Sequence, residues 1–195
     1  MNLPNKLTVL RIVLIPFMMF FYLAEFIPHG IGKIVALAIF IIAALTDLLD
    51  GMIARKYNLV TNLGKFLDPI ADKILTASVL FMIIADGTIP GPYGAIVVTI
   101  IIAREFMVSA LRLIAASQGT VLAADIWGKA KTMVQMIALP VCMLIPFVIE
   151  LGAVSWLVLT VKISAFVLLG IATLLTVISG INYLVKNRQC FKGSK

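Results

Sequence analysis

Four aspartates lie close together in this sequence, and carboxylates grouped in this way can bind a divalent metal ion. Asp47 and Asp50 are three residues apart, and Asp68 and Asp72 are four residues apart. Because residues at these spacings share one face of a helix, each pair is predicted to project from its own helix. The connection between the two helices is short, which predicts antiparallel neighbours whose acidic faces converge. Four converging carboxylates need either protons or a bound cation, so the pattern predicts a metal site.

The chemistry of these ligands favours a hard metal ion. Neither histidine nor cysteine accompanies the aspartates, and oxygen-only ligand sets are typical of Mg²⁺ or Mn²⁺ rather than structural zinc. One ion would fit, and so would a pair about 3.5–4 Å apart, a recurring arrangement in phosphoryl chemistry. Gly51 and Gly64 lie beside the acids. Because they lack side chains, a phosphate or nucleotide could approach the helix backbone there.

Single residues of this group also have ordinary structural explanations. Asp68 followed by Pro69 is the pattern of a helix N-cap with proline at the first helical position. The first aspartate pair could form ion pairs with Arg55 or Lys56, and Gly64 could end a turn. Taken together, four acids at fixed spacings on adjacent helices favour the metal site.

The composition places these helices in a membrane. Apolar residues make up 62% of the chain and charged residues 13%, whereas a soluble domain has roughly 45–50% and about 25%. A spanning helix needs about 20 mostly apolar residues, and six stretches qualify. They cover residues 7–27, 31–55, 64–85, 93–116, 126–149 and a stretch within 154–185. The sequence therefore predicts an all-α, polytopic membrane protein with six transmembrane helices and a single domain over residues 1–195.

The charged residues predict how these helices are oriented. The net charge is +7, but the basic residues cluster in short connections, where they set topology and attract anionic lipid headgroups rather than nucleic acid. The positive-inside rule then places both termini in the cytoplasm. Arg11 is expected to snorkel to the membrane interface. The charge-free runs 34–45, 74–85 and 93–103 are shorter than a bilayer, so the charged helix ends must line a polar cavity that opens to the cytoplasm.

The acidic pattern resembles the signature of the CDP-alcohol phosphatidyltransferase family, and every fixed position of that signature is present. These positions are Asp47, Asp50, Gly51, Ala54, Arg55, Gly64, Asp68 and Asp72. The resemblance implies a membrane enzyme that joins a CDP-activated lipid to a small alcohol. It implies that the four aspartates hold Mg²⁺ or Mn²⁺ and that Asp72 also acts as the base that activates the acceptor hydroxyl.

The resemblance also implies a pocket for the CDP group. The signature positions that would form it are Gly51, Ala54, Arg55 and Gly64. Arg55 would meet the nucleotide or its phosphates. Three further candidates for the same pocket are Asn5, Thr8 and Thr61, for which surface or capping roles fit equally well.

Two flanking parts of the sequence resemble bacterial members of the family that use glycerol 3-phosphate as the acceptor. They are residues 3–8 leading to Arg11, and residues 104–112 together with 127–132. This resemblance implies that CDP-diacylglycerol and glycerol 3-phosphate are the substrates and that phosphatidylglycerophosphate and CMP are the products. It also implies a homodimer in the cell membrane, with the active site facing the cytoplasm.

The phosphate of such an acceptor needs cationic side chains. Arg104 and Arg112 are eight residues apart, about two helical turns, so one face of a helix would carry both. Lys129 and Lys131 begin the next predicted helix, and the four cations suit a phosphate clamp. Alternatively, Arg112 and the two lysines contact lipid headgroups, and Arg104 pairs with an acid such as Glu105 across a helix contact.

Two other functions stay open. The same chemistry could use another acceptor: inositol phosphate, serine or a second phospholipid. Because intramembrane acids also serve as transport sites, a small cation or proton transporter is the alternative from a different class. Gly51, Ala54 and Arg55 at their fixed spacings have no role in a transporter.

Overall fold

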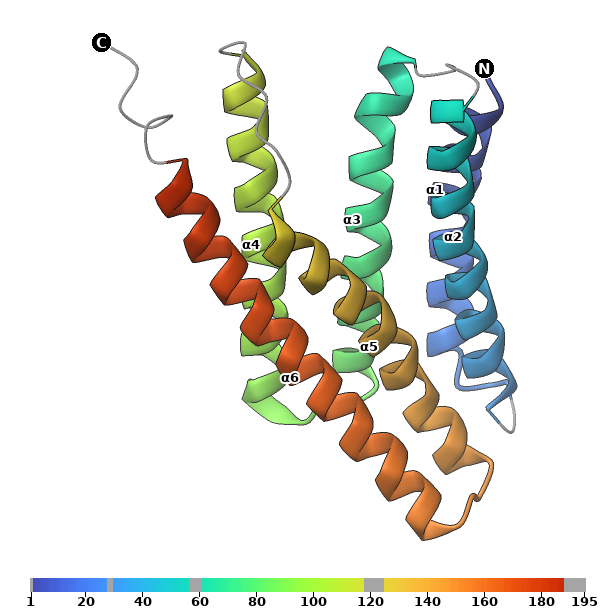
Figure 1. Ribbon diagram of the computed structural model, residues 1–195. Coiled ribbons are helices and arrows are strands. Elements are labelled where there is room, and N and C mark those ends of the chain that lie inside the picture. The colour runs from blue at the N-terminus through green and yellow to red at the C-terminus, as the bar shows by residue number, and fades with distance from the viewer. Residues whose placement is uncertain (1, 28–29, 57–60, 118–124, 188–195) are drawn as a thin grey trace. The chain divides into compact units, whose positions relative to one another are not determined.

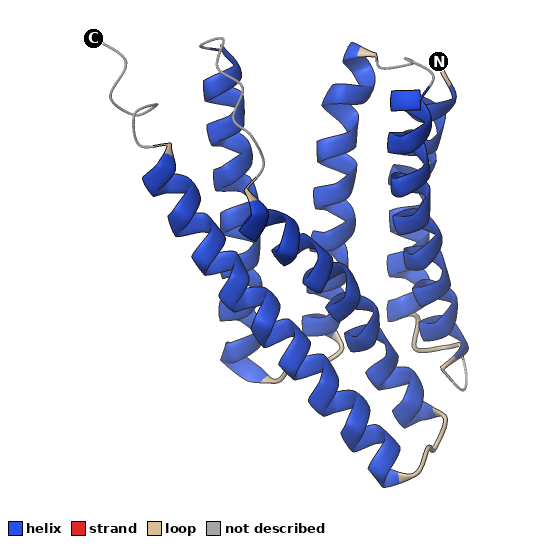
Figure 2. Cartoon of the chain, viewed as in Figure 1, coloured by secondary structure: helices blue, strands red, loops and turns tan. Residues whose placement is uncertain are grey.

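The structure is a computed structural model that describes residues 2–27, 30–56, 61–117 and 125–187. This part of the chain is helical and contains no strand (Figure 2). Its helices are α1 (Leu3–Leu23), α2 (Ile31–Lys56), α3 (Asn62–Ala85), α4 (Gly91–Ser117), α5 (Ile126–Glu150) and α6 (Ser155–Lys186). Each of the six predicted stretches is confirmed as a helix.

Among the described residues, four helices are long and apolar enough to cross a membrane: α1, α4, α5 and α6. Their outer faces carry large apolar side chains that are exposed, such as Phe17 and Phe20 on α1 and Leu174 on α6. Apolar surface of this extent is expected of a helix that faces lipid. In α2 and α3 the apolar residues give way to charged residues at one end.

The chain forms two compact units, and the first consists of Met1–Thr88 and Leu139–Lys162. In this unit α1 packs against both α2 and α3 (Figure 1). Apolar side chains from all three helices are almost completely buried here. Examples are Ile15 and Met18 on α1, Ala36 and Phe40 on α2, and Leu75 and Val79 on α3. Helix α1 therefore packs against both helices that carry the aspartates.

The second unit consists of Ile89–Ala138 and Ile163–Lys195. It contains α4, the first part of α5 and most of α6. Val108 and Leu111 of α4 are buried against Tyr183 of α6, and Met107 and Leu184 flank this small core. That the whole chain acts as a single domain stays a prediction.

Candidate active site

One turn of α1 contacts an aspartate on each acidic helix. Thr8 and Arg11 are three residues apart, so they lie on one face of α1. The hydroxyl of Thr8 donates a hydrogen bond of 2.7 Å to Asp68 Oδ1 on α3. The guanidinium of Arg11 forms an ion pair with Asp47 on α2, with 2.6 Å between Nη1 and Oδ1. The contacts of α1 therefore bring Asp47 and Asp68 to the same level of the bundle.

The Arg11 side chain turns into the helix bundle and pairs with Asp47, rather than extending along the surface of α1 as the expected snorkelling requires. Its side chain is completely buried, whereas that of Asp47 is 41% exposed. Arg11 Nε also donates a hydrogen bond of 3.2 Å to the carbonyl of Ala43 on α2. A buried cation needs such partners, and α2 supplies these two. The sequence signal for this role was the spacing of Asn5, Thr8 and Arg11, which places three polar residues on one face of a largely apolar helix.

The first turn of α3 is capped by Thr61, which confirms the capping role considered for that residue. The Thr61 hydroxyl accepts a hydrogen bond of 3.0 Å from the Gly64 amide and donates one of 2.9 Å to Asn5 Oδ1. The N-cap explanation of Asp68 is therefore wrong, because the helix begins earlier and Pro69 lies inside it. The helix tolerates this proline within its packed bundle although its ring removes a backbone hydrogen bond.

Gly64 lies inside the first turn of α3, so the interpretation that it ends a turn is also wrong. A Cβ at this position would lie 2.8 Å from Asn5 Oδ1 and 3.2 Å from Thr61 Oγ1. Asn5 and Thr8 are buried, with 4% and 1% of their surface exposed, so a surface role for these two residues is wrong. Glycine here allows α1 to approach the beginning of α3 closely.

The described carboxylates of this region are exposed or partly exposed, although two of them also contact side chains of α1. Asp68 is exposed, and Asp47 and Asp72 are partly exposed. Their oxygens are the donors that Mg²⁺ and Mn²⁺ prefer, so the donor chemistry fits such an ion. Among the side chains that the structure describes, no three acids, histidines or cysteines are grouped closely enough to hold a metal. Four other signature positions lie in the last turns of α2, and their surroundings are outside the described part: Asp50, Gly51, Ala54 and Arg55.

In the second unit, the predicted phosphate-binding residues Arg104 and Lys131 both pair with Glu105. Arg104 Nη1 lies 3.2 Å from Glu105 Oε1 on the same helix, and Lys131 of α5 donates a hydrogen bond to the same oxygen. The alternative that Arg104 pairs with Glu105 is confirmed, but the contact across two helices belongs to Lys131. Because only 2% of Lys131 is exposed, its assignment to lipid headgroups is wrong.

Two glycines make room for Arg104 among the helices of this unit. A Cβ at Gly128 of α5 would lie 3.3 Å from Arg104 Nη2, and a Cβ at Gly180 of α6 would lie 3.2 Å from Arg104 Cγ. The arginine is therefore held by small residues on both sides. A larger residue at Gly128 would press on its guanidinium, and one at Gly180 would press on its aliphatic chain.

The other two predicted clamp residues are exposed. Arg112 Nε donates a hydrogen bond of 3.4 Å to the Tyr183 hydroxyl, and its guanidinium lies 5.8 Å from the centre of that ring. Arg104 and Arg112 both contact α6, which confirms that one face of α4 carries them. Lys129 is exposed on the first turn of α5.

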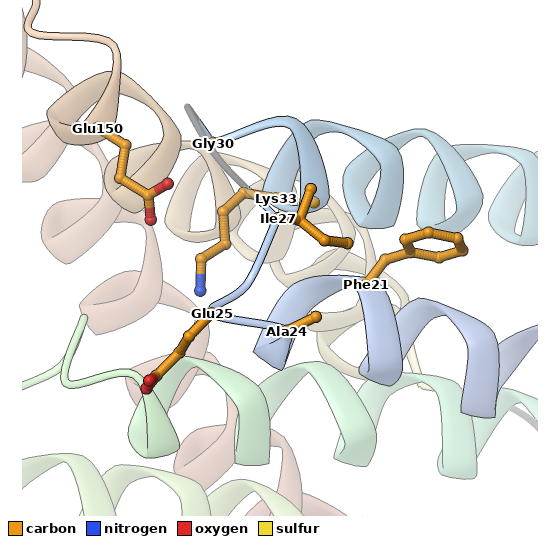
Figure 3. A pocket seen from close by; sticks show the side chains of 8 residues that line it. Phe21, Ala24, Glu25, Ile27, Gly30, Lys33 and Glu150 are labelled. Atoms are coloured by element: carbon orange, nitrogen blue, oxygen red, sulfur yellow. The ribbon is translucent and has the colours of Figure 1, made fainter.

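The opposite end of α1 has a second polar network. Tyr22 of α1 donates a hydrogen bond of 2.6 Å to Asp86 Oδ2, and Lys33 of α2 donates one of 2.7 Å to the Tyr22 carbonyl. A cavity of about 220 Å³ lies beside this network, and Figure 3 shows Lys33 and Glu150 turned toward it. Among the described residues that line this cavity, none belongs to the acidic signature.

Comparison with known proteins gives consistent matches over nearly the whole chain. The sequence model of the CDP-alcohol phosphatidyltransferase family matches residues 1–178. The chain is similar to the CDP-diacylglycerol–glycerol-3-phosphate 3-phosphatidyltransferase of Bacillus subtilis, at 41% identity over 99% of this chain and 98% of the relative. A relative of the same name from Haemophilus influenzae is 38% identical over 99% and 95% of the two chains. A probable phosphatidylglycerophosphate synthase of Mycobacterium tuberculosis is 38% identical over 95% and 81%.

Proposed function

Because the chain belongs to the CDP-alcohol phosphatidyltransferase family, we propose that it transfers the phosphatidyl group of CDP-diacylglycerol to glycerol 3-phosphate. The products are phosphatidylglycerophosphate and CMP. The names of the bacterial relatives support this choice of substrates. The structural observation that carries the proposal is the attachment of Asp47 and Asp68, from two different helices, to one turn of α1.

In the proposed reaction the aspartates have two tasks. Asp47, Asp50, Asp68 and Asp72 would hold one or two Mg²⁺ or Mn²⁺ ions, which would neutralise charge on the transferred phosphate. Asp72 takes the proton from the C1 hydroxyl of glycerol 3-phosphate. That oxygen bonds to the lipid-linked phosphorus, and the bond from this phosphorus to the CMP oxygen breaks.

The CDP group would bind beside these acids. Gly51, Ala54, Arg55, Gly64 and Thr61 would form its pocket, with Asn5 and Thr8 behind them. Asn5 and Thr8 are buried, and they accept and donate hydrogen bonds with Thr61, the N-cap of α3, and with Asp68 of α3, respectively. This burial supports a role in holding the pocket wall rather than in contacting the nucleotide.

The phosphate of glycerol 3-phosphate would bind to the four cations of the second unit. Arg112 and Lys129 are exposed, which suits direct contact with an incoming anion. Arg104 and Lys131 are held in place by Glu105. A carboxylate between two cations fixes their positions and leaves one net positive charge for the phosphate.

The proposal includes an arrangement in the membrane. All six helices span it, with α2 and α3 placing their charged ends around a polar cavity that opens to the cytoplasm. Both termini are cytoplasmic, as the distribution of basic residues favours. The protein acts as a homodimer in the cell membrane, as its resemblance to the family implies.

An acceptor panel tests the proposed reaction. The purified full chain in detergent is incubated with CDP-diacylglycerol and Mg²⁺ or Mn²⁺, and is offered glycerol 3-phosphate, inositol phosphate, serine or a phospholipid. We expect CMP release and a phosphatidylglycerophosphate product with glycerol 3-phosphate alone. Asp72→Asn should release no CMP because it lacks the base. Product with a different alcohol, or full activity of Asp72→Asn, would contradict the proposal.

The same assay examines the acceptor site. Arg112→Ala should raise the KM for glycerol 3-phosphate more than the KM for CDP-diacylglycerol, because it removes a cation from the acceptor side alone. Equal increases in both constants would argue against the clamp.

A further inference from the structure

Arg11 is a buried cation that contacts two groups on α2, a carboxylate and a backbone carbonyl. Its Nη1 lies 2.6 Å from Asp47 Oδ1, and its Nε donates a 3.2 Å hydrogen bond to the Ala43 carbonyl. Ala43 and Asp47 are four residues apart, so Arg11 bridges two consecutive turns of one helix face. A planar guanidinium held at two of its nitrogens has little freedom to turn.

This geometry excludes direct contact between Arg11 and a substrate. The Arg11 side chain has no exposed surface, while 41% of the Asp47 side chain remains exposed. An effect of Arg11 on chemistry at this end can pass through the Asp47 carboxylate, which contacts both the arginine and the outside of the bundle. The arginine holds that carboxylate from the protein side and leaves the outer side of the group accessible.

The charge of Arg11 also changes the electrostatic argument for this region. Grouped carboxylates repel one another, and the acids alone would favour protonation or splaying of the side chains. Arg11 places a permanent positive charge within 2.6 Å of one of them. Arg11 therefore supplies part of the positive charge that the grouped carboxylates need.

We propose that Arg11 is a positioning residue that holds the Asp47 carboxylate ready to bind the divalent ion. This inference rests on the proposed function, because that function assigns Asp47 to the ion. Groups that orient a metal ligand from behind contribute about 10–100-fold to metal affinity or activity. Arg11 belongs in this class although it never touches the ion or the substrates.

Titration with Mn²⁺ tests this role without relying on turnover. The free ion is measured by electron paramagnetic resonance as Mn²⁺ is added to the purified full chain in detergent. Arg11→Met removes the charge and the polar contacts with Asp47 and Ala43, and we expect its affinity for Mn²⁺ to fall about 10-fold or more. Arg11→Lys keeps the charge but cannot hold both α2 groups at once, so its affinity should lie between those of Arg11→Met and the wild type.

Lys33→Met provides a matched control. Lys33 is also a largely enclosed cation of the α1–α3 bundle, and it lies 4.0 Å from Asp86 at the opposite end. If Arg11 only stabilised the fold, both methionine variants would lower the unfolding temperature and neither would change Mn²⁺ affinity. We expect Lys33→Met to keep wild-type affinity.

The outcomes separate this inference from the proposed function. Wild-type or tighter Mn²⁺ binding by Arg11→Met overturns the positioning role, because tighter binding would mean that the arginine charge opposes the ion. If Arg11→Met does not fold, wild-type affinity in Arg11→Lys overturns it instead. A wild-type protein that binds Mn²⁺ but makes no phosphatidylglycerophosphate contradicts the proposed function and leaves the role of Arg11 intact.

Discussion

The two ends of the α1–α3 bundle contain similar polar groups, but one end leaves its carboxylates accessible and the other encloses its carboxylate. At the first end, Thr8 and Arg11 each hold one aspartate from behind. The side chain of Asp47 is 41% exposed and Asp68 is exposed. These acids keep oxygen atoms that can still bind something else.

At the second end the hydrogen-bonding capacity of the carboxylate is used within the protein. Asp86 accepts hydrogen bonds from the Tyr22 hydroxyl and from the Thr88 amide, at 2.6 and 2.9 Å. Lys33 lies 4.0 Å away, and only 9% of the Asp86 side chain is exposed. This network joins the helices and presents little of its carboxylate to a ligand.

The comparison shows that residue types alone do not distinguish a binding site from a purely structural polar network. Both ends have a basic residue, a hydroxyl group and an aspartate in contact. The difference lies in the carboxylate: at the first end the cation is buried and Asp47 is partly exposed, whereas at the second end both the cation and the carboxylate are largely enclosed. A buried cation behind an exposed acid leaves the acid available, whereas a buried acid is satisfied by the groups around it.

The strongest test of this contrast exchanges one aspartate at each end for asparagine. Asp47→Asn should lower kcat/KM by roughly 100-fold or more, because it removes a charged group that the proposed chemistry needs. Asp86→Asn should keep nearly all activity and lower the unfolding temperature, because it weakens a buried pair. CMP release and thermal unfolding in detergent measure the two effects. The contrast fails if both variants lose activity equally.

A pair of glycines sharpens the comparison. A Cβ at Gly32 would lie 2.3 Å from the Phe21 carbonyl oxygen, which is backbone, whereas a Cβ at Gly64 would meet the side chains of Asn5 and Thr61. Gly32→Ala should therefore be the more destabilising, by about 1–3 kcal/mol or more. Gly64→Ala should reduce stability less than Gly32→Ala does, but it should reduce activity more, because it displaces Asn5 beside the acids. Unfolding midpoints and kcat for both variants decide this. The reverse ranking would show that the Gly64 end is the more rigid.

The smallest expected difference comes from single hydroxyl groups. Thr8→Val removes the hydrogen bond to Asp68, and Tyr22→Phe removes the one to Asp86. Each loss should cost about 1 kcal/mol of stability. Only Thr8→Val should raise the Mn²⁺ concentration needed for half-maximal activity. A similar increase in Tyr22→Phe would mean that the metal requirement responds to general loosening of the bundle.

Much of the fold follows from the sequence because each helix is a long apolar run between polar connections. All six helices were predicted, and the structure changes their ends by only a few residues. The beginning of α3 shows why ends are harder to predict. Asp68 before Pro69 is a strong local capping pattern, yet Thr61 caps the helix and Pro69 lies within it. Packing of α1 against the first turn, through Asn5 and Gly64, outweighs the local preference.

The site was predictable to the extent that it depends on spacing. The helix period predicted that the acids share helix faces, and α1 contacts one aspartate of each pair, Asp47 and Asp68. That the four aspartates converge on a metal ion stays a prediction. The direction in which a long side chain leaves its helix depends on tertiary packing, so the sequence alone did not reveal that Arg11 turns inward. The same limit applies to Lys131, whose pairing with Glu105 depends on how α4 and α5 meet.

The inward direction of Arg11 has a consequence for the biogenesis of the protein. A lone arginine on an apolar helix costs free energy in the hydrocarbon region, about 2.5–3.5 kcal/mol at its centre. Two partners that offset this cost, Ala43 and Asp47, belong to the next helix to leave the ribosome. The first two helices are therefore expected to enter the bilayer together as a hairpin, rather than one after the other.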